Sequence, residues 1–242
     1  MIRDYLLPII VCLPIFGSLI DLSKKNKGLI SIVTIGLSML ASIYLAYQYY
    51  IDPSYYTTNT LINWIPFLDI NIDLFINKEY SLLLSLCLIC VFISCLIPMI
   101  DTKKGSINYP IIAILTSISA AFILSRNLPS KILFWEACWI PIFILMIKEK
   151  QNSLSVYFSR TWFIAELLLI GGLVTTQSSI NDNITFLFFV IGTIIRSMSL
   201  PFDRSILMIN QNCSKLTSLN SILILQILSI AFSFQVLTTF KT

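Results

Sequence analysis

Eight apolar runs divide the sequence, and this division is what most restricts the folds open to the chain. The runs are Leu6–Ile20, Leu29–Tyr50, Leu82–Ile100, Tyr109–Leu124, Ile132–Ile147, Phe163–Val174, Phe186–Leu200 and Leu219–Leu237. With their flanks they are long enough for helices to cross a hydrocarbon layer of about 30 Å. They lack the alternation of barrel strands, so helices are the way to satisfy the backbone in lipid. The sequence therefore predicts an all-α membrane protein of about eight transmembrane helices, with residues 1–242 as a single transmembrane domain.

The composition excludes several other classes of protein. Hydrophobic residues make up 57% of the chain and charged residues 12%, and a chain of 242 residues cannot enclose eight such runs in a soluble core. The net charge of +4 comes from basic residues that are scattered between the runs rather than gathered on one face. We therefore expect lipids as partners and no nucleic acid.

The cysteines give no indication of a metal or redox site. The chain has six cysteines, mostly inside apolar runs, and no histidine. Cys87 and Cys90 form a CxxC pair, but in the middle of a predicted transmembrane helix, and we interpret them as small buried hydrophobes. We expect the chain to bind neither a metal nor a cofactor of its own.

The basic residues between the runs predict an orientation. The 1–2, 3–4, 5–6 and 7–8 connections carry nine of them: Lys24, Lys25, Lys27, Lys103, Lys104, Lys148, Lys150, Arg204 and Lys215. The opposite side carries five: Arg3, Lys78, Arg126, Lys131 and Lys241. The positive-inside rule then places both termini outside. The long connection between residues 51 and 77 also lies outside, where its aromatic residues suit the membrane interface.

Charges inside the predicted helices are the candidate functional residues. Inserting each such charge into a membrane costs about 2.5–3.5 kcal/mol on insertion scales, so we expect each one to have an interaction partner or a function. Glu136 lies in the fifth run between bulky apolar residues, and Arg196 in the seventh run is its natural counter-ion across a helix interface. Pro201 predicts a break in the seventh helix that frees carbonyls near Ser197. Discontinuous helices beside buried charges form the ion sites of many transporters, although a static ion pair that locks two helices together is the alternative.

The sixth run contains a second set of charges. Arg160 and Glu166 are six residues apart and so lie on different faces of a helix. Arg160 can extend to the inner membrane surface, whereas Glu166 lies deeper and is a secondary candidate for a polar role between helices.

These residues resemble motifs of the antiporter-like proton-channel subunits shared by respiratory complex I, membrane-bound hydrogenases and multisubunit sodium/proton antiporters. Phe134-Trp135-Glu136 followed by Ile140-Pro141 is similar to the family's Phe-Phe-Glu-x-x-x-Ile-Pro segment, whose glutamate is the channel carboxylate. Arg196 followed by Pro201-Phe202 is similar to its Lys-x-x-x-x-Pro-Phe-His pattern on a broken seventh helix. The segment from Trp64 to Lys78 resembles the stretch before the third helix and favours NADH–ubiquinone oxidoreductase chain 4 over chains 2 and 5.

The chain departs from the family at positions that matter for proton transfer. The family's lysine is Arg196 here, and arginine does not deprotonate in proteins. Asp203 replaces the family's histidine, and the lysine position of the eighth helix falls near Gln226. The resemblance also covers only the N-terminal half of a family member, so that a separate polypeptide supplying the second half is one alternative and a reduced subunit is another.

The resemblance implies a non-redox subunit in the membrane arm of proton-translocating NADH:ubiquinone oxidoreductase, which contributes a modified or degenerate proton half-channel. Glu136, Arg196 and Glu166 would form its polar axis, and Pro201 its helix break. Other membrane-arm subunits would be the partners. The mitochondrial inner membrane is the expected location and a bacterial plasma membrane the alternative. Two further functions remain open: a structural membrane-arm component without ion flux, and a subunit of a multisubunit cation/proton antiporter.

Overall fold

A computed structural model describes residues 2–24, 28–52, 57–65, 70–100, 108–177, 182–197, 209–211 and 213–240. The chain divides into two compact units, Met1–Pro141 and Ile142–Thr242, and each is described by itself. The single domain that the sequence predicts for residues 1–242 stays a prediction.

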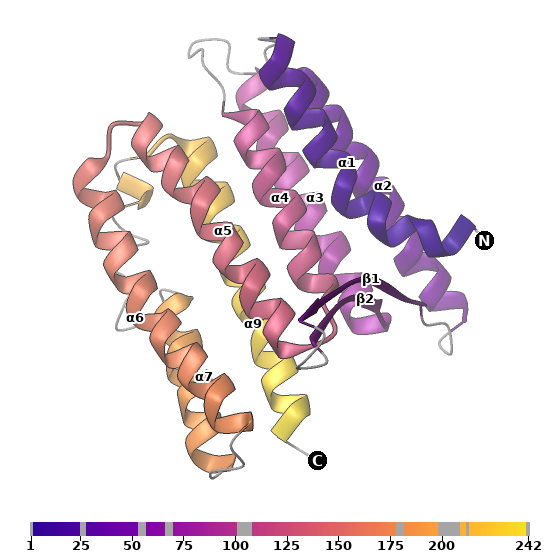
Figure 1. Cartoon of the computed structure of the whole chain (residues 1–242). Helices are drawn as coiled ribbons and strands as arrows, with labels where there is room; N and C mark the ends of the chain where they lie inside the picture. Colours follow the sequence, from indigo (N-terminus) through magenta and orange to yellow (C-terminus); the bar gives the residue numbers. More distant parts are fainter. Residues whose placement is uncertain are drawn as a thin grey trace. The chain divides into compact units, whose positions relative to one another are not determined.

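The first unit contains four helices and the start of a fifth. These are α1 (Ile2–Lys24), α2 (Leu29–Ile51), α3 (Lys78–Ile100), α4 (Tyr109–Leu124) and α5 (Leu128–Lys148), which continues into the second unit. Helix α1 packs between α2 and α4, and α3 packs on α2 and α4 (Figure 1). Each helix matches one predicted apolar run.

The second unit contains the end of α5 and three further helices. These are α6 (Asn152–Gln177), α7 (Asp182–Arg196) and α9 (Lys215–Phe240). Helix α7 packs along α6 and also contacts α9. Among the described residues, six helices are long and apolar enough to cross a membrane, and α4 is a shorter apolar helix. The prediction of an all-α, multi-pass membrane protein is confirmed.

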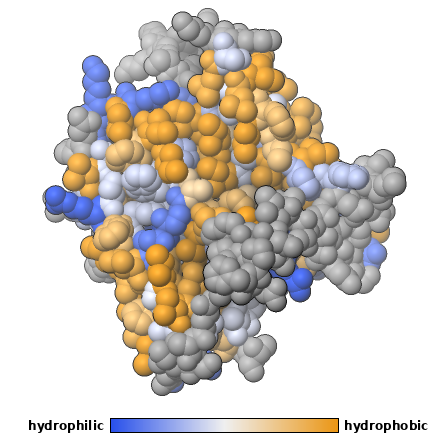
Figure 2. All heavy atoms as spheres, in the orientation of Figure 1, coloured by the Kyte–Doolittle hydropathy of each residue, from blue (hydrophilic) through white to orange (hydrophobic). Residues whose placement is uncertain are grey.

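Large hydrophobic side chains cover much of the helical surface. Leu40, Leu86 and Phe163 are each more than half exposed. Figure 2 shows extensive hydrophobic surface over the described helices. Water would not solvate such a surface favourably, whereas lipid would.

The connection between α2 and α3 holds a β-hairpin that the sequence analysis did not predict. Strands β1 (Thr57–Ile65) and β2 (Ile70–Ile76) pair in antiparallel fashion. The hairpin is tied to the helices because the Tyr49 hydroxyl donates to the Ile76 carbonyl at 2.9 Å and the Arg126 N–H to the Asp73 carbonyl at 3.1 Å. Leu74 also forms a β-bridge with Ser125. These contacts therefore hold the hairpin against the residues that directly precede α5.

A buried carboxylate caps the start of α2. Gly28, which precedes α2, has a φ of 81° and offers no side chain to cap the helix. One oxygen of Asp21, from α1, instead accepts hydrogen bonds from the N–H and the hydroxyl of Ser31 at 2.7 and 2.6 Å. The negative charge lies where the helix dipole favours it, and it joins α1 to α2.

Helix α9 in the second unit is capped in a similar way by a distant carboxylate. Glu149, just after α5, accepts hydrogen bonds from the N–H of Ser214 at 2.6 Å and from the hydroxyls of Ser214 and Thr217 at 2.6 and 2.5 Å. These contacts hold the start of α9 against the connection between α5 and α6.

Cys213 lies next to this cap, and we expect its thiol to be unreactive. Burial raises the pKa of the Cys213 thiol to about 12, and the Glu149 carboxylate adds to this increase. Since the thiolate is the nucleophile, maleimide should label a variant whose only cysteine is Cys213 about a hundredfold more slowly at pH 8 than it labels glutathione. The rate should rise about tenfold for each unit of pH between 7 and 10. The Glu149→Gln change should speed labelling, and a rate that levels off near pH 8.5 would contradict the expected pKa.

Candidate functional site

The second unit brings two of the predicted site residues together. Arg196 is the last residue of α7, and its Nη1 lies 3.2 Å from Oε2 of Glu166 on α6. The Arg196 side chain is fully buried, and that of Glu166 is 18% exposed. Glu166, the secondary candidate of the sequence analysis, is thus the carboxylate that pairs with Arg196 within this unit.

An aromatic ring completes the environment of Arg196. The guanidinium carbon lies 4.2 Å from the ring centroid of Trp162, close enough for a cation–π interaction. Trp162 and Glu166 are four residues apart on α6, so they lie on the same helical face. Sequence analysis missed Trp162, although this spacing from a buried carboxylate was a usable signal.

Small residues allow α6 and α7 to approach closely enough for the ion pair. A Cβ added to Gly192 would lie 2.9 Å from Cδ2 of Leu169, and one added to Gly172 would lie 2.8 Å from Cε1 of Phe189. Glycine at such positions is a common device for close packing of transmembrane helices. Gly192 is four residues before Arg196, so the closest approach lies one turn from the ion pair.

Helix α7 ends at Arg196, next to the break expected at Pro201. The carbonyl of Ser197 accepts a hydrogen bond from the Gln226 amide of α9 at 2.8 Å. This carbonyl lies in the region where the sequence predicts carbonyls freed by a helix break, and that break stays a prediction. Pro201 itself lies outside the described residues, so its role stays a prediction.

Polar side chains of α7 and α9 gather beside this helix end. Thr193, Ser197, Gln226, Ser229 and Ser233 lie around an open groove of about 340 Å³, together with apolar side chains. The hydroxyls of Thr193 and Ser229 donate to carbonyls four residues earlier in their own helices. The groove therefore combines these polar side chains with a surface that is mostly apolar.

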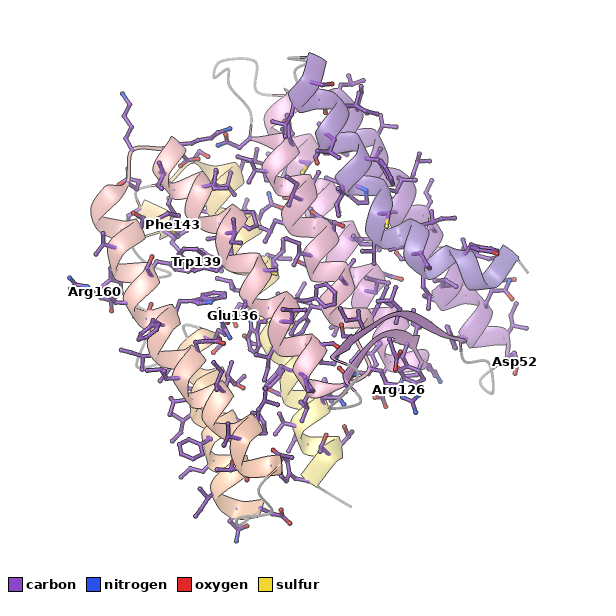
Figure 3. All side chains as sticks on the ribbon, in the orientation of Figure 1. Asp52, Arg126, Glu136, Trp139, Phe143 and Arg160 are labelled. Carbon is purple, nitrogen blue, oxygen red and sulfur yellow. The ribbon has the colours of Figure 1, made fainter. Side chains whose placement is uncertain are left out.

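Glu136 lies in the other unit, in the middle of α5. Its side chain is half-buried, and the ring of the preceding residue, Trp135, packs edge-on against Phe122 of α4. Figure 3 shows Glu136 and Trp139 on the α5 ribbon, one turn apart. The pairing of Glu136 with Arg196 stays a prediction, because the two residues belong to different units.

Lys131 is a buried charge that the sequence analysis placed outside the fifth run. The structure places it within α5, with a relative exposure of 0%. Its Nζ lies 4.4 Å from the ring centroid of Tyr80 and 5.3 Å from that of Phe122. One hydrogen bond, at 3.5 Å, goes to the Phe122 carbonyl.

Arg160 takes no part in the ion pair of α6. Its side chain is exposed and points away from the helix in Figure 3. That Arg160 extends to the inner membrane surface stays a prediction. Within the described residues, no group of three or more histidine, cysteine or acidic side chains could hold a metal ion.

Comparisons with known proteins find similarity at the level of structure. No family model matches the chain, and no curated protein sequence does. A chain of the respiratory complex I from Thermus thermophilus with bound NADH superposes with a TM-score of 0.76 at 15% identity, covering 91% of this chain and 50% of that chain. A chain of an archaeal membrane-bound sulfane sulfur reductase superposes with a TM-score of 0.74 at 12% identity, covering 97% and 41%.

The chain shares the fold of these respiratory membrane proteins. It spans half or less of the length of each chain that it matches. At these identities the similarity concerns the fold, and function has to be argued from the residues of the site.

Proposed function

We propose that this chain is a chain-4-like, non-redox subunit in the membrane arm of a proton-translocating NADH:ubiquinone oxidoreductase, where it contributes a modified half-channel. The observation that supports this most is the shared fold over 91% of the chain with part of a respiratory complex I. The complex would reside in the mitochondrial inner membrane or a bacterial plasma membrane. Other membrane-arm subunits would cover part of the apolar surface, and no cofactor would be bound by this chain.

The buried charges support a role in proton transfer rather than a purely passive one. In the proposal, Glu136 is the carboxylate that takes up and releases a proton, because a glutamate within a membrane helix can exist in both forms. Arg196 is a fixed positive charge, since a guanidinium does not deprotonate in proteins. Glu166 neutralises Arg196, and Pro201 interrupts the helix beside them.

Two observations keep alternative functions in view. The pairing of Arg196 with Glu166 at 3.2 Å is also what a static helix clamp requires, which favours a structural subunit without ion flux. The similarity to a chain of the sulfane sulfur reductase, which covers 97% of this chain, favours a respiratory membrane complex with a different reductase activity. A subunit of a cation/proton antiporter is the third alternative.

Native electrophoresis of gently solubilised membranes tests the proposal directly. We expect this chain to migrate with NADH dehydrogenase activity, together with other membrane-arm subunits that mass spectrometry identifies in the same band. A polypeptide with the missing helices in that band would indicate a split subunit. Migration apart from all NADH-oxidising activity would contradict the assignment to complex I.

A further inference from the structure

One exposed face of α6 carries a charge within an apolar row of side chains. The members of this row are three or four residues apart and all exposed: Val156, Arg160, Phe163, Leu167, Ile170 and Val174. This spacing aligns side chains along one side of a helix, which is how one helix packs lengthwise against another. We call this row the Arg160 stripe.

Arg160 lies well inside the helix rather than at its end. Helix α6 has 26 residues, so it is about 39 Å long, and Arg160 stands about 12 Å from its first residue. With α6 centred in a hydrocarbon layer of about 30 Å, Arg160 lies about 7 Å below the edge of that layer. Among the described residues, no other charged side chain is both exposed and more than two turns from an end of its helix.

The described part of the chain offers Arg160 no opposite charge. The other charge on α6, Glu166, pairs with Arg196, and no described carboxylate forms an ion pair with Arg160. Figure 3 shows the Arg160 side chain pointing sideways, away from α6. Charged side chains within membrane helices are rare and almost always paired, so Arg160 calls for an anion on this face.

A row of the same spacing on α2 shows what the arginine changes. Exposed residues stand there at three- and four-residue intervals, and none of them is charged: Val33, Leu37, Leu40, Tyr44 and Tyr47. Acyl chains solvate such a row favourably. The Arg160 stripe would suit acyl chains equally well with an apolar residue at position 160, so the arginine is what indicates a different neighbour.

We propose that the Arg160 stripe is the docking site for a transmembrane helix of a second polypeptide, which carries an aspartate or glutamate at the level of Arg160. The planar guanidinium matches a carboxylate, and polar pairs of this kind hold membrane helices together. The partner's apolar side chains pack along the rest of the stripe, from Phe163 to Val174. A lipid phosphate is the rival anion, but it lies at the membrane surface, whereas a carboxylate on a helix can stand at the depth of Arg160. This inference rests on the proposed function, in which the partner is another membrane-arm subunit.

Photocrosslinking in native membranes tests the docking site. The photoreactive residue p-benzoylphenylalanine replaces Phe163, which is 63% exposed and one turn from Arg160. We expect an adduct with one membrane polypeptide, linked within a transmembrane segment that contains an aspartate or glutamate. The matched control is the same replacement at Phe16 of α1, which is also 63% exposed, and it should give at least about fivefold less of this adduct.

Substitutions of Arg160 in the same photoreactive variant test the charge. Arg160→Glu should lower the yield of the adduct about tenfold or more, because it sets two carboxylates against each other. Arg160→Lys keeps the charge and should stay within about twofold of the wild-type yield. Changing the partner's carboxylate to arginine should restore the adduct in Arg160→Glu. If Arg160→Glu does not accumulate in the membrane, Arg160→Met decides, with an expected loss of about fivefold or more.

Three results would overturn the inference. An adduct with lipid alone would show that the stripe faces acyl chains or headgroups, and equal yields at Phe163 and Phe16 would show that the stripe is not a specific surface. A polypeptide adduct whose yield is unchanged in both Arg160→Glu and Arg160→Met would remove the arginine from the contact. Failure of the proposed function is distinguishable, because the charge-dependent adduct would then form in a complex without NADH dehydrogenase activity.

Discussion

Replacing Arg196 with methionine is expected to lower the free energy of unfolding by about 3 kcal/mol, because it leaves the carboxylate of Glu166 inside the protein without its positive partner. The stacking of the guanidinium on Trp162 is lost as well. For a chain of this length, the loss corresponds to a decrease in Tm of about 6–12 °C. Thermal unfolding of the purified protein in detergent measures it.

A double-mutant cycle identifies the ion pair as the cause. Glu166→Gln alone should destabilise at least as much, since it leaves a buried arginine that cannot lose its charge. The double variant should be more stable than the sum of the single losses predicts, by about 1–3 kcal/mol. Arg160→Met is the control for removing an arginine from a helix, and it should change stability by about 0.5 kcal/mol or less because Arg160 is exposed. Additive losses would contradict the pairing.

The helices of this fold could be predicted because every segment that crosses lipid has to satisfy its own backbone hydrogen bonds. Each apolar run had to become a helix, and each described helix lies on one run. The hairpin was not predicted, although Ile70, Ile72, Leu74 and Ile76 alternate with other residues as strand positions do. Within an apolar chain, a short alternating segment is easily taken for an interfacial connection.

The partners of the buried charges could not be predicted in the same way. The sequence offers two carboxylates to Arg196, and the side chain that pairs with it depends on how closely α6 and α7 approach at Gly172 and Gly192. A run of apolar residues also does not give the rotation of a helix about its axis. Lys131 was therefore assigned to the membrane surface, whereas the rotation of α5 turns it toward Tyr80 and Phe122.

Glu136→Gln is expected to abolish proton translocation through this chain while the complex still assembles. Glutamine has nearly the same size and can accept and donate hydrogen bonds, but it cannot take up or release a proton. A half-buried side chain of unchanged volume should have little effect on packing. Proton uptake by membrane vesicles during NADH oxidation, normalised to the amount of assembled complex, measures the effect.

The matched control for Glu136→Gln makes the same chemical change at the surface. Glu79 is exposed at the start of α3, and Glu79→Gln should leave translocation at the wild-type rate. Unchanged translocation in Glu136→Gln, with normal assembly, would remove the channel role and leave the structural interpretation, in which Arg196 and Glu166 only hold α6 and α7 together. Loss in Glu136→Gln alone would mean that a chain with a fixed arginine at position 196 still moves protons, and that Glu136 is the group that takes them up and releases them.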